Sequence, residues 1–318
     1  MWILRIKMFI LLAVLFAIIY AVVSLIAYTS GITNFYFYLI LSLIIMFIQY
    51  MIGPKLVEYM LNVIYVTETE YPQLHQMVAE LALKAGIPKP KVGVSLVSLP
   101  NAFAFGRSIA DGRVCVTKGI LQLLSKEELK AVLGHEISHI KNHDMLTITL
   151  LSVIPMILYR IAWQMMWVRS DKRQRGPSPA LIGLISFLFY FITNLLVLYA
   201  SRIREYFADR GSIALGKPGT SLASALYKLV YGSARLDKEE LRKVEGLKAF
   251  FLNDPSQALE EIRTLRQIDL DRSGTIEPEE LELLQRKRIK LTVADRLLEL
   301  LSTHPNMLKR IKALSSLD

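Results

Sequence analysis

The stretch that decides the fold covers residues 124–144 and reads LSKEELKAVLGHEISHIKNHD. Apolar residues recur in it at intervals of three and four, which is the spacing of one face of a helix. Ser125 and Glu128 have the spacing of a capping box, in which each side chain binds a backbone N–H at the start of a helix. The stretch therefore predicts an amphipathic helix, and it contains the pattern H-E-x-x-H at residues 135–139.

The two histidines of this pattern, His135 and His139, are four residues apart, so a helix places both imidazoles on one face. They can therefore bind one metal ion together. Glu136, beside them, can accept a proton from a water molecule that such a metal activates. The alternative is an ordinary amphipathic helix with two polar histidines. Gly134, which permits close approach of another segment, and the apolar neighbours of the pattern favour the metal site.

The composition indicates a membrane protein. Of 318 residues 53% are hydrophobic, and the mean hydropathy of +0.38 is too high for an ordinary soluble protein. The single cysteine, Cys115, excludes an intrachain disulfide framework and a cysteine-rich zinc site. The net charge of +10 suits basic edges that face anionic lipid headgroups. Since no basic stripe with interleaved aromatic residues is present, we expect no nucleic-acid partner, and no motif suggests a small-molecule cofactor.

Four apolar runs are long enough to span a bilayer as helices: residues 8–28, 35–53, 146–168 and 180–200. The first two predict a transmembrane hairpin rather than a signal peptide, because the second run follows the first at once. Basic residues precede and follow this hairpin, which places both of its ends in the cytoplasm. The loop of the second pair is basic, against the same rule. That pair either spans or forms a shallow cap on the catalytic domain, and spanning is our prediction.

These runs divide the chain into four parts: a transmembrane hairpin (1–54), a first catalytic part with the H-E-x-x-H helix (55–145), a second transmembrane pair (146–200) and a second catalytic part (201–318). Within the first catalytic part we expect a helix over residues 67–85, ended by Gly86. Residues 91–97 and 113–117 alternate as strands do. The last part is polar and mostly helical.

A catalytic zinc site needs three protein ligands and one open position. His143 lies eight residues after His135, or about 12 Å along one helix, which is too far to share the ion. Glu205 is a better candidate, because Asp209 follows one turn later and can hold a ligand imidazole by its other nitrogen. The alternative is a surface glutamate balanced by neighbouring arginines. Spacing alone does not decide between these two interpretations.

Four motifs, taken in order, resemble the HtpX-type membrane zinc metalloproteases, which are relatives of the CAAX prenyl endopeptidases. They are PNAFAFG at residues 100–106, GHEISHIKNHD at 134–144, EYFAD at 205–209 and STHPNMLKRI at 302–311. The resemblance covers nearly the whole chain. It implies a mainly α, α+β fold: a multi-span membrane protein with a thermolysin-like (gluzincin) zinc protease domain that carries a small sheet.

The resemblance also implies a role for each matching residue. One zinc ion per chain would be bound by His135, His139 and Glu205. Glu136 would be the general base, and His304 would help to stabilise the oxyanion. Asp209 and Arg310 would hold the zinc ligands in position without binding zinc themselves.

The resemblance makes PNAFAFG an edge strand that pairs with an extended substrate. Asn101, Ala102 and Phe103 would then bind the substrate. The alternative is a buried strand end filled by Phe103 and Phe105, and both interpretations can hold together.

The implied activity is that of a zinc metalloendopeptidase of the cell membrane whose active site faces the cytoplasm. Its expected partners are the lipid bilayer and protein substrates, chiefly misfolded or damaged membrane proteins. One alternative is a CAAX-type processing protease, although its chamber of seven spans would need more apolar runs than four. The other is a catalytically silent, calcium-sensing membrane scaffold, which the complete set of zinc ligands and base disfavours.

Residues 269–280, DLDRSGTIEPEE, match the calcium loop of an EF-hand, which the HtpX pattern does not include. Six residues fill the ligand positions of the template: Asp269, Asp271, Ser273, Thr275, Glu277 and Glu280. Gly274 takes the sharp turn at position 6, and helical patterns flank the loop within residues 257–290. The alternative is a charged turn that shares this spacing. We predict that the loop binds Ca²⁺ and that calcium orders the flanking helices.

Overall fold

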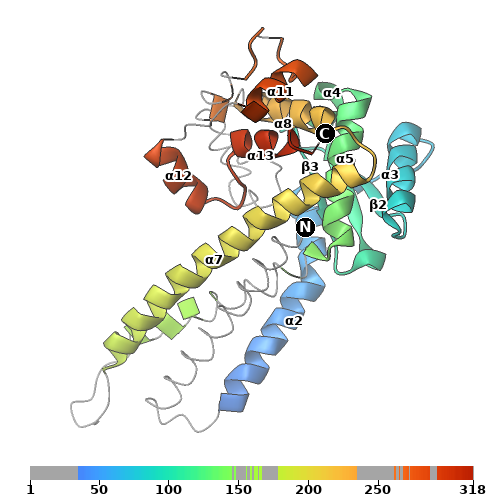
Figure 1. Cartoon of the computed structure of the whole chain (residues 1–318). Coiled ribbons are helices and arrows are strands. Elements are labelled where there is room, and N and C mark those ends of the chain that lie inside the picture. Colours follow the sequence, from blue (N-terminus) through green and yellow to red (C-terminus); the bar gives the residue numbers. More distant parts are fainter. Residues whose placement is uncertain are drawn as a thin grey trace. The chain divides into compact units, whose positions relative to one another are not determined.

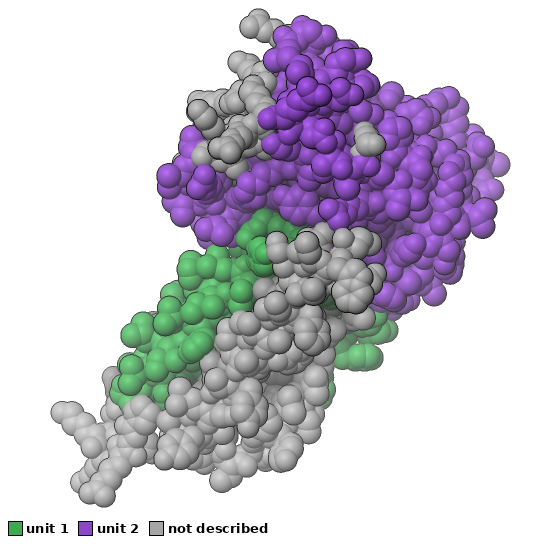
Figure 2. All heavy atoms as spheres, viewed as in Figure 1, with its two compact units in different colours: residues 1–52, 146–203 green, residues 53–145, 204–318 purple. Residues whose placement is uncertain are grey.

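The computed structural model describes residues 35–144, 178–234, 273–286 and 292–317, together with residues 147, 155, 158–159, 161–163, 165–166, 261–262, 265 and 268–271 (Figure 1). The chain forms two compact units (Figure 2), one of residues 1–52 with 146–203 and one of residues 53–145 with 204–318. The predicted span over residues 8–28 lies outside the described residues, as does most of the span over 146–168. The predicted four-part domain division stays a prediction.

Two long helices contribute to the first unit, α2 (Phe35–Met60) and α7 (Pro179–Ala214). They contain the apolar runs 35–53 and 180–200. Within the part of the chain that the structure describes, α7 is the one helix whose length and composition would let it cross a membrane; its most apolar window has a mean hydropathy of 2.3 and is 28% buried. A multi-span arrangement stays a prediction.

The second unit contains a four-stranded mixed sheet. Its strands are β1 (Val63–Tyr65), β2 (Lys91–Ser95), β3 (Ala102–Phe105) and β4 (Arg113–Thr117). The strand order is β1-β2-β4-β3, in which β2 and β4 run parallel and the other two pairs antiparallel. Phe103 of β3 pairs with Cys115 of β4. Because β3 is last in the strand order, it forms one edge of the sheet among the described strands. The expected small sheet is therefore confirmed.

Helices make up most of the rest of this unit, so the mainly helical fold class is confirmed as well. They are α3 (Pro72–Ala85), the 3-10 turn η1 (Ile109–Asp111), α4 (Lys118–Leu123), α5 (Lys126–Lys141), α8 (Gly219–Ala234), α11 (Pro278–Arg286), α12 (Val293–Leu300) and α13 (Met307–Leu314). The helix α5 packs against α3, α8 and β3, which places it in the core of the unit.

Two predicted boundaries differ from the structure. The helix expected from Thr67 begins at Pro72, because the fixed φ of proline suits the first turn of a helix, and Thr67 instead forms a local turn by donating its N–H to Glu70. It ends as predicted at Gly86, whose φ of 71° is left-handed. The strand expected over residues 91–97 ends at Ser95, the last of its residues that pairs with β1 and β4.

Small residues allow α5 and the last part of α7 to approach each other closely. A Cβ on Gly134 would lie 3.0 Å from Ser212 Oγ, and one on Gly211 would lie 2.6 Å from Ser138 Cβ. Ser212 Oγ also donates a hydrogen bond to the carbonyl of Ala131 at 2.7 Å. The expectation that Gly134 permits close approach of another segment is confirmed, and the segment is the one that carries Glu205.

Candidate metal centre

The helix α5 positions the H-E-x-x-H side chains, and its first turn is fixed by a capping box. Glu128 Oε2 accepts the N–H of Ser125 at 2.8 Å, and Ser125 Oγ accepts the N–H of Glu128 at 3.4 Å, as the sequence predicts. Val132, Leu133 and Ile137 are fully buried on the apolar face. This packing orients His135 and His139 toward the last part of α7.

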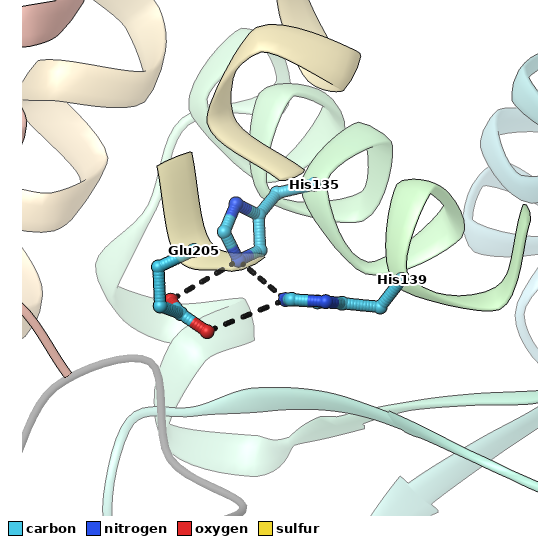
Figure 3. A group of neighbouring side chains, drawn as sticks. All are labelled: His135, His139 and Glu205. Atoms are coloured by element: carbon cyan, nitrogen blue, oxygen red, sulfur yellow. Dashed lines mark hydrogen bonds and ion pairs between the residues drawn. The ribbon is translucent and has the colours of Figure 1, made fainter. Parts of the chain in front are cut away.

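Three side chains from the two helices meet at one point (Figure 3). His135, His139 and Glu205 each offer a ligand atom within 4.8 Å of the others. The two Nε2 atoms are 3.0 Å apart, and the carboxylate oxygens of Glu205 lie 3.6 Å from His135 Nε2 and 3.5 Å from His139 Nε2. These distances suit three ligands around one ion.

Each imidazole has a carboxylate beside its Nδ1 atom. This carboxylate determines which of the two ring nitrogens carries the proton. His135 Nδ1 lies 2.9 Å from Asp209, and His139 Nδ1 hydrogen-bonds Asp144. A carboxylate beside Nδ1 favours the tautomer with the proton on Nδ1, which leaves a lone pair on Nε2. The two lone pairs then face each other beside the Glu205 carboxylate. Such a set of donors fits a cation.

The surroundings of the two imidazoles shift their pKa values in opposite directions. Burial lowers the pKa of His135, but Asp209 and Glu205 outweigh this effect and raise it to about 9. Burial and the neighbouring His135 lower the pKa of His139 to about 4. Two histidines with one carboxylate form a common ligand set for catalytic zinc.

Arg310, on α13, holds the acidic residues of the site. Its side chain is completely buried, and it donates to both oxygens of Asp209, at 3.0 and 2.7 Å. Its Nη1 also lies 3.0 Å from Glu205 Oε2. His304 Nδ1 lies 3.5 Å from the same oxygen. The structure thus brings His304, Asp209 and Arg310 to the metal ligands.

Glu136 lies on α5 next to the two ligands and close to β3. This residue is 4% exposed, and burial raises the pKa of its carboxyl group above the ordinary value, although His135, His139 and a backbone hydrogen bond from Ala104 each act to lower it. A carboxylate placed beside two metal ligands can accept a proton and pass it on. This position suits a general base beside the edge strand.

The residues predicted to bind substrate lie at or next to β3, but their side chains point inward. Asn101, Ala102 and Phe103 are each at most 2% exposed. The rings of Phe103 and Phe105 stack at 5.8 Å within a separate apolar cluster. The predicted buried strand end is therefore present. Any contact of this strand with a substrate would have to be made by its backbone.

The sequence interpretation missed Asp144 and Arg204. Arg204 Nη2 lies 2.7 Å from Asp144 Oδ1, so it holds the carboxylate that supports His139. A carboxylate five residues after a ligand histidine was the available signal. The reason given against His143 was also wrong, because α5 ends at Lys141 and His143 has a left-handed φ of 55°. His143 is still not part of the metal-ligand group among the described residues.

The predicted calcium ligands lie elsewhere in the second unit. Asp269, Asp271 and Glu280 offer carboxylate oxygens within 4.8 Å of one another. Glu277 is exposed and is not part of this group, while the hydroxyls of Ser273 and Thr275 lie 2.9 Å apart.

Comparison with known proteins identifies the class to which this fold and site belong. The model of peptidase family M48 matches residues 68–318, and the chain belongs to this family. A protease HtpX homolog of Methanothermobacter thermautotrophicus is 52% identical over 229 residues, which cover 72% of this chain and 86% of the relative. One of Aeropyrum pernix is 32% identical over 289 residues, 87% of this chain and 85% of that relative.

Among solved structures, the chain is similar to Ste24p of S. mikatae, with a TM-score of 0.50 and 18% sequence identity. The similarity covers 98% of this chain and 66% of that chain, and at this identity it concerns the fold alone. The family and the HtpX homologs show that the chain is a metalloprotease, and the resemblance drawn from its four motifs is confirmed.

Proposed function

We propose that this metalloprotease is an integral-membrane, zinc-dependent endopeptidase that cleaves misfolded or damaged membrane proteins. The observation that carries the proposal is the meeting of His135, His139 and Glu205 beside the buried carboxylate of Glu136. One zinc ion per chain would be bound by the first three. When bound, zinc polarises a carbonyl group and makes water more acidic.

The protein's own groups perform the proton transfers. Glu136 accepts a proton from the attacking water and passes it to the leaving amine, and its place on α5 between the two ligand histidines suits both steps. Asp209 and Asp144 keep the protons of the two ligand imidazoles on Nδ1. Nδ1 of His304 faces Glu205, whereas its Nε2 has no hydrogen-bond partner among the described residues, so Nε2 can donate to the oxyanion that develops on the substrate.

The substrate would add to β3 as an extra strand. Its place at one edge of the described sheet supports this proposal, and so does the hydrogen bond from the Ala104 backbone to Glu136. The backbone of Asn101 and Ala102 would bind the substrate. Phe103 would contribute by anchoring the strand in the apolar cluster beneath it.

The proposed membrane location rests on the apolar helices. Exposed side chains of α2 include Phe47 and Ile52, and those of α7 include Leu184 and Leu188. Basic residues at the ends of the predicted hairpin favour an active site that faces the cytoplasm of the cell. A membrane-embedded protease meets membrane proteins as its nearest substrates. We propose in addition that calcium modulates the activity.

The test uses full-length protein purified in detergent and loaded with zinc. We expect wild type and Glu127→Gln to cleave an unfolded protein such as casein, because Glu127 is an exposed residue of the first turn of α5. Glu136→Gln should keep its zinc and lose cleavage by at least about a hundredfold, the scale of general-base catalysis. Cleavage by Glu136→Gln at the wild-type rate would overturn the proposed mechanism.

A further inference from the structure

The acidic loop of residues 269–280 is not used by the peptidase site. Two of its three converging carboxylates, those of Asp269 and Glu280, are buried at 7% exposure each, and the third, that of Asp271, is exposed. We propose that this loop binds one calcium ion and that the bound ion regulates the metal centre. The binding site depends on the geometry of the loop alone, whereas the regulation rests on the proposed function.

The backbone of the loop is bent so that its first, third and twelfth positions converge. Gly274, at the sixth position, has a φ of 81°, and its N–H donates to Asp269 Oδ2 at 3.2 Å. A Cβ on Gly274 would meet nothing within 4 Å, so backbone conformation rather than space calls for glycine here. Asp271 Oδ1 accepts the N–H of Ser273 at 2.9 Å. This is the arrangement that an EF-hand loop requires.

One buried oxygen of the loop lacks a partner. Asp269 Oδ2 accepts from Gly274 and from the hydroxyl of Tyr227, whereas Oδ1 is buried with no hydrogen-bond partner among the described residues. A buried carboxylate oxygen without a partner is costly, because it has lost water and gained nothing. A cation held between Asp269, Asp271 and Glu280 would supply the missing interaction.

The choice of calcium follows from the kind of ligand and from the charge. All the candidate ligand atoms are oxygens, which favours calcium over zinc and other metals that prefer nitrogen or sulfur. Glu280 reaches back across the loop, where its two oxygens accept the N–H groups of Leu270 and Glu277 at 2.6 and 3.2 Å. The carboxylate oxygens of Asp269, Asp271 and Glu280 lie within 4.8 Å of one another. A divalent cation would relieve the repulsion between these charges.

A short chain of contacts links the loop to the H-E-x-x-H helix. Tyr227, which donates to Asp269, lies on α8. On the same helix, Ser224 Oγ donates to Glu128 Oε1 at 2.6 Å and Lys228 Nζ lies 2.8 Å from that oxygen. Glu128 in turn caps the first turn of α5. Fixing Asp269 on calcium would therefore also fix α8 against the start of α5.

A second chain of contacts reaches the back of the metal centre. The helix α11 begins within the last part of the loop, at Pro278, and packs against α13. Before the loop, Glu261 accepts the N–H of Met307 at the start of α13, at 3.3 Å. Arg310 of α13 holds Asp209 and Glu205. Segments on both sides of the loop thus contact the helix that supports the zinc ligands, so we expect calcium to raise the activity.

The binding test uses zinc-loaded, full-length Glu136→Gln protein in detergent, so that hydrolysis plays no part. Calorimetric titration should show one calcium per chain, with a Kd between about 10 μM and 1 mM. Asp271→Asn and Glu280→Gln should each weaken binding at least about tenfold, as expected when one charged ligand is lost. Glu279→Gln is the matched control, because Glu279 is an exposed neighbour on α11 outside the group, and it should bind as the parent does.

Absence of calcium binding up to about 10 mM, beyond the range of weak EF-hand sites, would overturn the proposal. Equal binding by all four proteins would also overturn it, because the calcium would then be bound elsewhere. Asp271 is exposed, so Asp271→Asn tests the site without disturbing the core even if Glu280→Gln folds poorly.

The regulation is tested by hydrogen exchange and by hydrolysis of casein. Calcium should slow amide exchange in α8 and α13 of the wild type, and raise kcat/KM about fivefold or more, a typical size of coupling between two sites. In Asp271→Asn both changes should need at least about tenfold more calcium. Calcium binding without either change would refute the regulation. Slowed exchange in a protein that never cleaves casein would refute the proposed function and leave the calcium site standing.

Discussion

At the scale of single residues, the metal centre depends on carboxylates that are not metal ligands themselves but hold the ligand histidines in place. Asp144 hydrogen-bonds His139 Nδ1 and is itself held by Arg204 at 2.7 Å. Because this contact fixes the tautomer and the orientation of the ring, we expect Asp144→Asn to weaken zinc binding by about 10–100-fold. Competition with a chelator of known affinity would measure the change.

The control for this prediction is Asp111→Asn. Asp111 forms its ion pairs with Arg107 and Arg113, and it is not part of the metal-ligand group. We expect this variant to bind zinc as the wild type does. If Asp144→Asn retained wild-type zinc affinity, the role given to Asp144 would be wrong.

The residues of the site differed in how far the sequence could predict them. His135, Glu136 and His139 follow from helical spacing, whereas the choice of Glu205 needed the resemblance to a family. Asp144 was missed although it stands five residues after His139, because its contact with His139 depends on the left-handed φ of 55° at His143. Residues other than glycine rarely adopt that conformation, so helical spacing does not predict the contact.

At the scale of elements, the site depends on the close approach of α5 and the last part of α7. A Cβ on Gly211 would lie 2.6 Å from the Cβ of Ser138, so Gly211→Ala would force the two helices apart. A shift of about 1 Å is enough to spoil a metal site. We expect Gly211→Ala to lose most of its zinc and its cleavage of casein, as measured by metal analysis and activity.

A second substitution separates this steric effect from other causes. Ser138→Gly removes the side chain that the new methyl group would meet, so the double variant should recover zinc binding and activity. Gly216→Ala shows what a strained backbone does without a steric clash between helices. Gly216 has a φ of 82°, which disfavours alanine, but a Cβ there would meet only the end of Lys84. Full zinc content in Gly211→Ala would contradict the account of this helix contact.

The elements themselves were predicted to different degrees. The capping box correctly predicted where α5 starts. The alternation of residue types over residues 113–117 predicted β4 with its correct limits. The three residues of β1 are too few to show any alternation, and they form a strand only because β2 offers an antiparallel partner. The helix α3 starts later than predicted for a local reason, the proline at its first turn.

At the scale of the whole molecule, the proposed arrangement in the membrane can be tested by labelling. If both apolar pairs span, residues near the start of α7 lie on the outer side of the membrane and the catalytic part lies inside. A membrane-impermeant maleimide should then label Ser178→Cys in intact cells, and Glu279→Cys only after permeabilisation. The native Cys115 is completely buried and should not react in either case.

Equal labelling of both positions in intact cells would contradict the proposed location of the active site. Labelling of Ser178→Cys only after permeabilisation would favour the shallow cap. The sequence could not decide between these arrangements, because the basic loop between the second pair of apolar runs opposes the positive-inside rule while the first hairpin obeys it. Length and hydropathy identify a helix that can span but not its orientation.

The central claim is that His135, His139 and Glu205 bind one catalytic zinc ion, and X-ray absorption at the zinc edge tests it most directly. The full-length protein should contain one zinc per chain, bound by two imidazole nitrogens at about 2.0–2.1 Å and by oxygen atoms at about 2.0–2.2 Å. Glu205→Ala should lose the ion or one oxygen ligand. A zinc-free protein, a sulfur ligand, or an unchanged spectrum in Glu205→Ala would contradict the account.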